Sequence, residues 1–166
     1  MNKTEHQKEE FKETRRGTVH FILVHSYLIF LFAVILGVLF DTFLTEKIFS
    51  HGVYRITGFV MLIISSIIIY WAQSVSANYK ERMEKSESRS HFEFGPYRYL
   101  RSPTHFGLFI MTLGLGLIIN SLFSVIFTIV AYLITKLFFL KKEEMLLEKK
   151  YGETYINYKK KVKNWI

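Results

Sequence analysis

The feature that most constrains the fold is a 37-residue run, Thr104 to Leu140, in which Lys136 is the only charged side chain. A helix needs about 20 apolar residues to cross the hydrocarbon core of a bilayer, so this run is too long for one span and long enough for two. Asn120-Ser121 is the polar pair near its middle. The sequence therefore predicts a tight turn there, between membrane helices over about 104–119 and 122–140.

Two more apolar segments precede this run, at about 19–40 and 53–72. The first is interrupted by polar residues and ended by an acidic one: His20, His25, Ser26, Tyr27 and Asp41. We interpret His25 as a bundle-facing side chain hydrogen-bonded to a neighbouring helix, in preference to a substrate contact. The fold class predicted is all-α: one polytopic membrane domain, residues 1–166, with four transmembrane helices.

The C-terminal segment, residues 141–166, is basic and has an apolar periodicity of three and four residues. The residues on that face are Leu147, Tyr151, Tyr155, Tyr158, Val162 and Trp165. This spacing indicates an amphipathic helix lying at the membrane surface, which Gly152 interrupts. An interfacial helix with no further role is the alternative interpretation.

Lys and Arg alternate along the chain in a way that predicts orientation. The N-terminal segment carries five, the first loop one, the second loop six, the 120–121 turn none and the tail eight. The positive-inside rule then places both termini and the second loop in the cytoplasm. The net charge of +8 flanks apolar segments, so anionic lipid headgroups are expected partners and nucleic acid is not. The absence of cysteine excludes disulfides and thiolate metal sites, and no other metal-ligand spacing is present.

Both prolines of the chain lie in one short stretch before the long apolar run: Gly95-Pro96-Tyr97-Arg98-Tyr99-Leu100-Arg101-Ser102-Pro103-Thr104-His105-Phe106-Gly107. Gly95 and Pro96 are turn residues, and Pro103 suits the first turn of a helix, where its missing N–H has no partner to lose. The stretch therefore predicts a turn, a basic aromatic segment at the membrane surface and the start of a helix.

This stretch resembles a signature of the isoprenylcysteine carboxyl methyltransferase and phospholipid N-methyltransferase group of integral-membrane enzymes. A second, distant match strengthens the resemblance: Glu143-Glu144-Met145-Leu146-Leu147-Glu148-Lys149-Lys150-Tyr151-Gly152-Glu153-Thr154-Tyr155. Together the two cover about residues 92–163. The chain departs from the usual Arg-His-Pro-x-Tyr at two places, because Ser102 fills the His position and His105 the Tyr position. The imidazole is thereby displaced by three positions, about one helical turn.

The resemblance implies a cytoplasmic-face site for S-adenosylmethionine within this region. Its implied cofactor-binding residues are Tyr97, Arg98, Pro103, His105, Gly107, Glu143 and Glu144. Carboxylates suit the cofactor's amino group or ribose, and aromatic rings suit its adenine and sulfonium. The residues predicted to act in catalysis are Arg101, His105 and Glu144, with a lipid or prenylated small molecule as methyl acceptor.

Several alternatives remain open at this point. A carboxylate acceptor would need a cation to hold it, Arg101, Lys149 or Lys150, whereas an amine would need a base, for which His105 is the candidate. Gly107 and Gly114 share a helix face that serves either close helix packing or room for a flat ligand. The function itself has two rivals: an NADPH-dependent membrane reductase of the sterol-reductase type, and a non-catalytic membrane protein that retains the fold.

Overall fold

The computed structural model describes residues 24–43, 52–83 and 95–162, and this part of the chain contains helices and no β-strand. In chain order the elements are the first helix, Val24–Phe43, then α2, Val53–Met83, the 3₁₀ turn η2, Gly95–Arg98, α3, Pro103–Ile119, α4, Leu122–Ile134, the π-helical segment η3, Thr135–Leu140, α5, Lys141–Tyr151, and α6, Glu153–Lys161. The predicted all-α fold class is confirmed.

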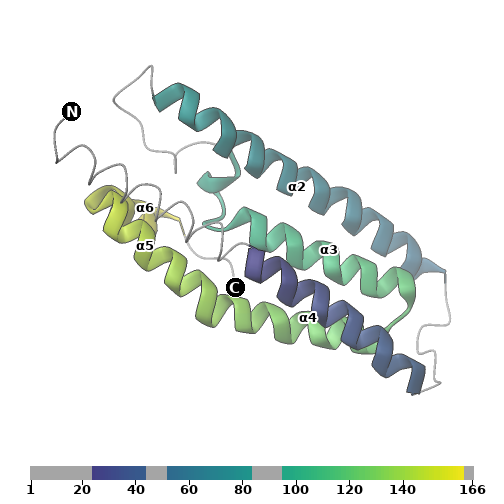
Figure 1. Cartoon of the computed structure of the whole chain (residues 1–166). Helices are drawn as coiled ribbons and strands as arrows, with labels where there is room; N and C mark the ends of the chain where they lie inside the picture. Colours follow the sequence, from purple (N-terminus) through teal and green to yellow (C-terminus); the bar gives the residue numbers. More distant parts are fainter. Residues whose placement is uncertain (1–23, 44–51, 84–94, 163–166) are drawn as a thin grey trace, which may run out of the picture.

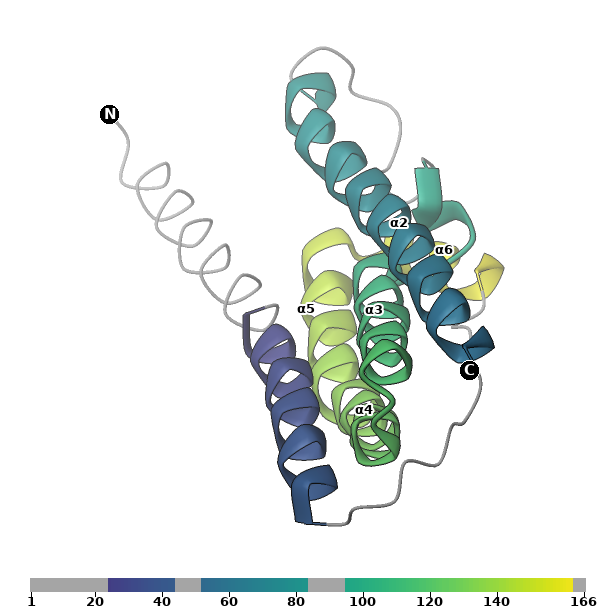
Figure 2. The same cartoon turned by 90° about the vertical axis from the view of Figure 1, so that its right-hand side faces the viewer.

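The long helices lie side by side in a bundle (Figures 1 and 2). α3 lies between α2 on one side and the first helix and α4 on the other. α4, η3 and α5 follow one another along one continuous rod, and α6 turns back beside the far end of α5 (Figure 1). The residues just before α3, Gly95–Ser102, and the last helix therefore meet at the same end of the bundle.

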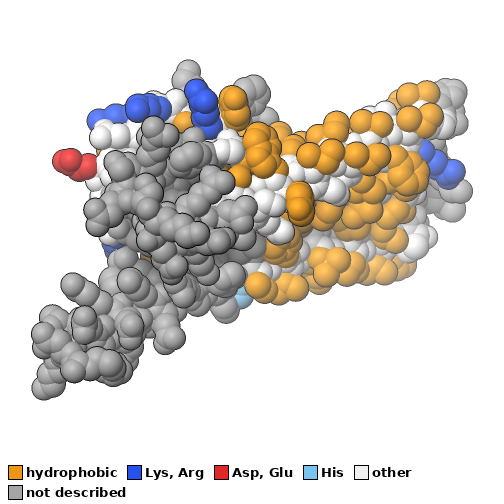
Figure 3. Space-filling model, turned by 90° about the horizontal axis from the view of Figure 1, so that it is seen from above, with side chains coloured by type: hydrophobic (Ala, Val, Ile, Leu, Met, Phe, Trp, Pro, Cys, Tyr) orange, Lys and Arg blue, Asp and Glu red, His pale blue; other side chains and the backbone are white. Residues whose placement is uncertain are grey.

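Three helical stretches are long and apolar enough to cross a bilayer: Val24–Phe43, Val53–Ser76 and Leu122–Lys149. α3 is equally apolar but has 17 residues, which at 1.5 Å per residue give a length of about 25 Å, short of a hydrocarbon core of about 30 Å. The protein is thus a helical membrane protein, and the predicted count of four spans stays a prediction. Exposed hydrophobic side chains cover the right-hand part of the face seen in Figure 3, and Lys and Arg side chains lie to either side of them.

Glycines bring α2 and α3 into backbone contact. A Cβ on Gly58 would lie 2.7 Å from the carbonyl oxygen of Gly114, and a Cβ on Gly114 would lie 2.8 Å from that of Gly58. Both distances are shorter than atoms tolerate, so each position requires glycine. Gly107 also faces α2, because a Cβ there would lie 2.6 Å from Cγ1 of Ile69. The geometry of Gly107 and Gly114 is that of helix packing, the first of the two alternatives left open by the sequence.

The predicted tight turn at Asn120-Ser121 is confirmed. Asn120 ends α3 with a left-handed backbone, φ 60° and ψ 45°, a conformation that Asn tolerates better than most residues. Ser121 begins α4, and its side-chain oxygen accepts a hydrogen bond from the backbone N–H of Ser124 at 3.0 Å. This cap fixes α3 and α4 as neighbours.

Two boundaries differ from those that the sequence predicts. α2 continues beyond residue 72 to Met83, because no Gly or Pro occurs between residue 72 and Gly95 to stop it. The tail forms two helices in place of one, because Gly152 has a φ of 55° that ends α5 and starts α6. The predicted start of the first span, 19–23, and most of the N-terminal and loop charges lie outside the described residues.

The bundle has an apolar core, and the returning tail has a separate one. Phe30, Ala33, Leu108 and Ala131 form the first, from the first helix, α3 and α4. Tyr155 and Tyr158 form the second, with Leu147 and Val162 packed against them. The second cluster holds α6 against α5 at the end of the bundle where the two predicted motifs converge.

Candidate functional site

The described part of the connection between α2 and α3 is Gly95–Ser102, called the connecting segment below, and it is held in place by its own turn and by α2. Gly95 has a φ of 61°, and a Cβ there would lie 2.6 Å from Val75 of α2. The carbonyl of Pro96 accepts the backbone N–H groups of Tyr99 at 3.1 Å and Leu100 at 2.9 Å. The Tyr97 hydroxyl shares a hydrogen bond of 2.9 Å with the Ser76 hydroxyl. These contacts position Arg101 immediately before α3.

Arg101 ties the connecting segment to both C-terminal helices. Its Nη1 donates to Oε1 of Glu144 on α5 at 3.0 Å. Its Nε donates to the carbonyl of Val162 at 2.7 Å and its Nη2 to the carbonyl of Lys159 at 2.8 Å, both at the C-terminal end of α6. Carbonyls at that end of a helix lack partners within the helix and carry partial negative charge, so a guanidinium suits them. Three donors of one side chain thus fix α6 relative to α5.

Lys159 completes this cluster of charges. Its Nζ lies 2.8 Å from Oε2 of Glu144 and 2.9 Å from Oε1 of Glu148. Hydrogen bonds to Glu144, and then to Glu148, raise the pKa of Lys159, so it remains charged at neutral pH. Glu144 therefore receives one cation on each of its oxygens.

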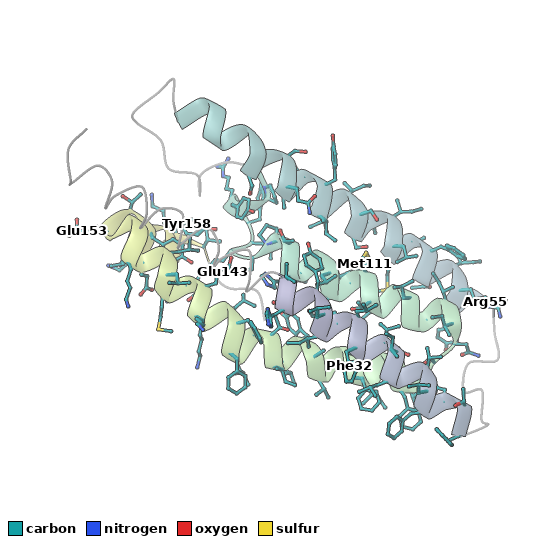
Figure 4. All side chains as sticks on the ribbon, viewed as in Figure 1. Phe32, Arg55, Met111, Glu143, Glu153 and Tyr158 are labelled. Atoms are coloured by element: carbon teal, nitrogen blue, oxygen red, sulfur yellow. The ribbon has the colours of Figure 1, made fainter. Side chains whose placement is uncertain are left out.

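Two buried tyrosines of α6, Tyr155 and Tyr158, lie close to Arg101 and Glu144. The Tyr158 hydroxyl donates to the backbone carbonyl of Tyr97, and the rings of Tyr155 and Tyr158 are 5.7 Å apart. Burial raises the pKa of both phenols above the ordinary value, as it does for Tyr97. All three hydroxyls are therefore neutral hydrogen-bonding groups at physiological pH. Figure 4 shows Tyr158 and Glu143 at the same end of the bundle, with Arg55 at the other and Glu153 at the outer end of α6.

His105 lies in the first turn of α3, where its ring faces two other elements. Its Nε2 is 3.2 Å from the hydroxyl of Ser26 on the first helix, and its Nδ1 is 3.9 Å from Oε2 of Glu143 on α5. His105 is 4% exposed and Ser26 1%. Oε2 of Glu143 is buried and has no hydrogen-bond partner in the described part of the chain. A buried carboxylate oxygen without a partner is costly to desolvate, so this atom is suited to receive a ligand's cationic or N–H group.

The structure brings most of the predicted site residues together. We define the polar rim as Arg101, His105, Glu143, Glu144 and Lys159, with Tyr97 next to it. The remaining predicted positions lie around this group. Pro103 is buried in the first turn of α3, Arg98 is exposed at the end of η2, and Gly107 faces α2.

Sequence reasoning missed two members of the site. Ser26 lies far from both motifs, and its one signal was its position among the polar residues that interrupt the first apolar segment. Lys159 sat in a run of lysines, Lys159-Lys160-Lys161, that offered no reason to single it out. Its position follows from the turn at Gly152, which brings α6 back toward Glu144.

The described residues contain no group of three His, Asp or Glu side chains placed to hold a metal ion. Two acidic side chains, one of which has an unpartnered oxygen, and the neutral phenols instead form a set of hydrogen-bond acceptors that suits an organic cation.

The phospholipid methyltransferase family profile matches residues 53–154, from the start of α2 through the turn between α5 and α6. The match contains the connecting segment, His105 and the Glu143-Glu144 pair, whereas Ser26, Tyr155, Tyr158 and Lys159 lie outside it. No curated protein and no solved structure matches the chain. Since the profile covers more than half of the chain, this membrane protein belongs to the phospholipid methyltransferase family.

Proposed function

We propose that this protein methylates the amine of a phospholipid headgroup at the cytoplasmic face of the membrane, with S-adenosylmethionine as the methyl donor. The observation that carries the proposal is the buried, unpartnered Oε2 of Glu143, placed beside His105 in a chain of this family. Both the donor and the headgroup amine are cations, and an unpaired carboxylate favours either.

The residues of the rim fit the donor. When bound, S-adenosylmethionine supplies an electrophilic methyl group, and the C–S electron pair stays with sulfur as the new N–C bond forms. Glu143 would accept from its amino group or ribose, with Glu144 as the neighbouring acceptor. Exposed Arg98 would pair with its carboxylate, and Tyr97 would lie against its flat or cationic parts. Pro103 and Gly107 would shape the inner end of the cofactor site, because they fix where α3 starts and how closely it packs on α2.

The hydrogen bonds that Arg101 already makes favour an amine over a carboxylate as the methyl acceptor. A carboxylate acceptor needs a cation that is available to hold it, but three nitrogens of Arg101 already donate to Glu144, Lys159 and Val162. Lys149, the other described candidate, is exposed on α5. Arg101 is therefore a positioning residue, which holds Glu144 and α6, in place of the substrate-binding cation that the sequence suggested as one alternative.

An amine acceptor must lose a proton before its nitrogen can attack, and His105 is the base we propose. Its ring takes the proton from the headgroup ammonium, and Glu143 stabilises the imidazolium that forms. The methylated product carries the positive charge away on nitrogen. Burial of the ring among α3, α5 and the first helix keeps bulk water from competing for the proton.

The cytoplasmic location is supported by the charge pattern. The rim lies at the end of the bundle to which the second loop and the tail belong, with six and eight basic residues, and the uncharged Asn120-Ser121 turn lies at the other end. A soluble donor then enters from the cytoplasm, and a headgroup reaches the same site from the lipid.

A labelled-methyl assay tests this function. The full-length protein in detergent is given methyl-labelled S-adenosylmethionine, with either phosphatidylethanolamine or S-farnesylcysteine as methyl acceptor. We expect label in phosphatidylethanolamine. Glu143→Gln should lower the rate by about 100-fold, as for loss of one preorganised charge at a reacting centre. Glu153→Gln, an exposed glutamate at the outer end of α6, is the matched control. Label in farnesylcysteine alone would contradict the amine acceptor, and calorimetric binding of NADPH without S-adenosylmethionine would favour a reductase.

A further inference from the structure

We propose that the π-helical segment η3 is a positioning element, which turns Glu143 and Glu144, the acid pair, toward the polar rim. Without its wider turn, Lys142 would face the bundle in their place. η3 lies in the middle of the continuous rod that α4, η3 and α5 form (Figure 1). The consequence for methyl transfer rests on the proposed function, whereas the placement of the acid pair does not.

The side of α4 that faces the bundle is regular up to η3. Its buried residues, each at most 3% exposed, recur at intervals of four, three and four positions: Ser124, Thr128, Ala131 and Thr135. An α-helix has about 3.6 residues per turn, so these intervals bring the four side chains to one side of the axis. This side packs inside the bundle.

At η3 the interval lengthens to five positions. The next buried residue after Thr135 is Leu140, which is 6% exposed. A turn of π-helix, with its hydrogen bonds between residues five apart, contains about one residue more than a turn of α-helix. The bundle-facing side then continues into α5 with the acid pair, whose side chains are 20% and 14% exposed, and with Leu147, which packs against the tyrosine cluster of α6.

A regular α-helix over the same residues would present a different side chain to the bundle. Successive residues are about 100° apart around an α-helix axis, so Lys142, seven positions after Thr135, would lie on the same side as Thr135. Glu144, nine positions after Thr135, would point to the opposite side, away from Arg101. A cation would then take the side that the acid pair now occupies, beside a guanidinium that it repels. In the structure Lys142 is exposed instead.

Packing of the apolar core does not require the additional residue. Leu137 and Phe138, in the middle of η3, are 54% and 68% exposed, so neither side chain fills a space inside the bundle. What the wider turn changes is the direction in which α5 presents its charges. It keeps Lys142 outside and directs the acid pair into the polar rim, which fits the frequent occurrence of single π turns at functional sites.

The first measurement needs no donor or lipid. The chain has no cysteine, so one introduced cysteine reports which side of the rod is accessible. Leu140→Cys and Lys142→Cys, each in the full-length protein in detergent, are treated with a water-soluble maleimide. We expect Lys142→Cys to react and Leu140→Cys to be protected. In a regular α-helix position 140 would lie about 140° from Thr135 and position 142 would face the bundle. Protection of Lys142→Cys would therefore overturn the inference.

The second measurement changes the length of η3. Deletion of Phe138 brings Leu140 four positions after Thr135, which is an α-helical interval, so a regular helix then presents the same side to the bundle. Trypsin cleavage at Lys159–Lys161 should stay at the wild-type rate, and methyl transfer should persist. One alanine inserted after Phe138 should turn α5 by about a further 100° and separate Glu144 from Arg101. Cleavage of α6 should then rise sharply and methyl transfer fall by about 100-fold.

Deletion of Ile63 is the matched control, because Ile63 is 62% exposed in α2, which is α-helical throughout. A regular helix has no wider turn to absorb the change, so one side of Ile63 must rotate by about 100° against α3, and the Tm should fall clearly. A Phe138 deletion that loses as much Tm and α6 protection as the Ile63 deletion would overturn the inference. A wild type with the expected maleimide labelling that methylates no amine lipid would overturn the proposed function alone.

Discussion

Along α2 and α3, Gly58 and Gly114 place two helix backbones in direct contact, whereas at the polar rim the contacting groups are charged side chains and helix-end carbonyls. The glycine contact brings the two backbones together without any charged group, so its stability comes from van der Waals contact along the interface. The rim contact depends on Arg101, whose three donors each have a different acceptor.

The glycine contact and the rim contact therefore stabilise different parts of the protein. Contact between α2 and α3 is the most extensive among the elements from α2 onward, so a disturbance there moves the whole bundle. The rim holds one short helix, α6, whose own core is the pair Tyr155 and Tyr158. We therefore expect interface variants to change global stability and rim variants to change the docking of α6 and the reaction.

The largest effect is expected for Gly58→Ala. The new methyl group would lie 2.7 Å from the Gly114 carbonyl oxygen and from Cγ1 of Ile118, and the backbone atom cannot move without separating the helices. Overpacking of this kind destabilises a protein by about 1–3 kcal/mol. Thermal unfolding in detergent should show a clearly lower Tm, with activity lost in proportion to the folded fraction.

Gly52→Ala is the control for that experiment, because no atom of the described residues lies within 4 Å of a Cβ at this exposed position. Its Tm should equal that of the wild type. If Gly58→Ala also retains the wild-type Tm, the close backbone contact between α2 and α3 is contradicted.

Arg101→Gln should have the next largest effect, on α6. The variant leaves Glu144 with one cation and removes both donors to the end of α6. Loss of one partner from a largely buried charge pair costs about 3–5 kcal/mol, an upper limit here because these side chains are 12% and 14% exposed. Limited trypsin digestion should cleave at Lys159–Lys161 much faster than in the wild type, and methyl transfer should fall by about 100-fold or more.

Arg55→Gln provides the comparison, since Arg55 is an exposed arginine at the opposite end of the bundle. It should change neither digestion nor activity. Rapid methyl transfer by Arg101→Gln with α6 protected from trypsin would show that the guanidinium does not position this helix.

Tyr158→Phe should weaken the same docking to a smaller extent. The substitution keeps the ring in its cluster with Tyr155 and removes the hydroxyl that donates to the Tyr97 carbonyl. A neutral hydrogen bond contributes about 0.5–1.5 kcal/mol, so trypsin cleavage of α6 should rise several-fold while the Tm stays nearly constant. Tyr99→Phe, at an exposed ring, is the control. Equal protection of the two variants would contradict a role for the Tyr158 hydroxyl.

The sequence predicted the elements well where local signals were strong. Turn-forming and helix-starting residues, hydropathy and charge predicted three features: the Asn120-Ser121 turn, the start of α3 at Pro103 and the meeting of the two motifs. These local signals do not show which residues of neighbouring helices lie opposite one another. The sequence placed Gly107 and Gly114 on one helix face, but nothing in it identified Gly58 of α2 as the residue opposite Gly114.

The site was predicted as a set of residues, without the division of roles among them. Arg101 was expected to bind substrate or acid, yet the acceptors of two of its three donors are backbone carbonyls, which a side-chain pattern does not reveal. Ser26 contacts His105 across 79 positions of sequence, a pairing set by how the first helix packs on α3. Such contacts depend on tertiary packing and carry no periodicity for a sequence pattern to detect.

The smallest effect is expected for Lys159→Gln, because Lys159 is 37% exposed and pairs with Glu144 and Glu148 near solvent. Exposed pairs contribute about 0.2–1 kcal/mol, so the increase in trypsin cleavage of α6 should be slight and should disappear in high salt. Its raised pKa places the pH dependence outside the physiological range. The attraction is fully present below the ordinary lysine pKa and is lost only as pH rises through the higher folded-state value, so the contribution of Lys159 to α6 docking should be constant across neutral pH. Lys160→Gln, at an exposed neighbour, is the matched control, and a loss of docking for Lys159→Gln as large as for Arg101→Gln would mean that the lysine, not the arginine, fixes α6 to the rim.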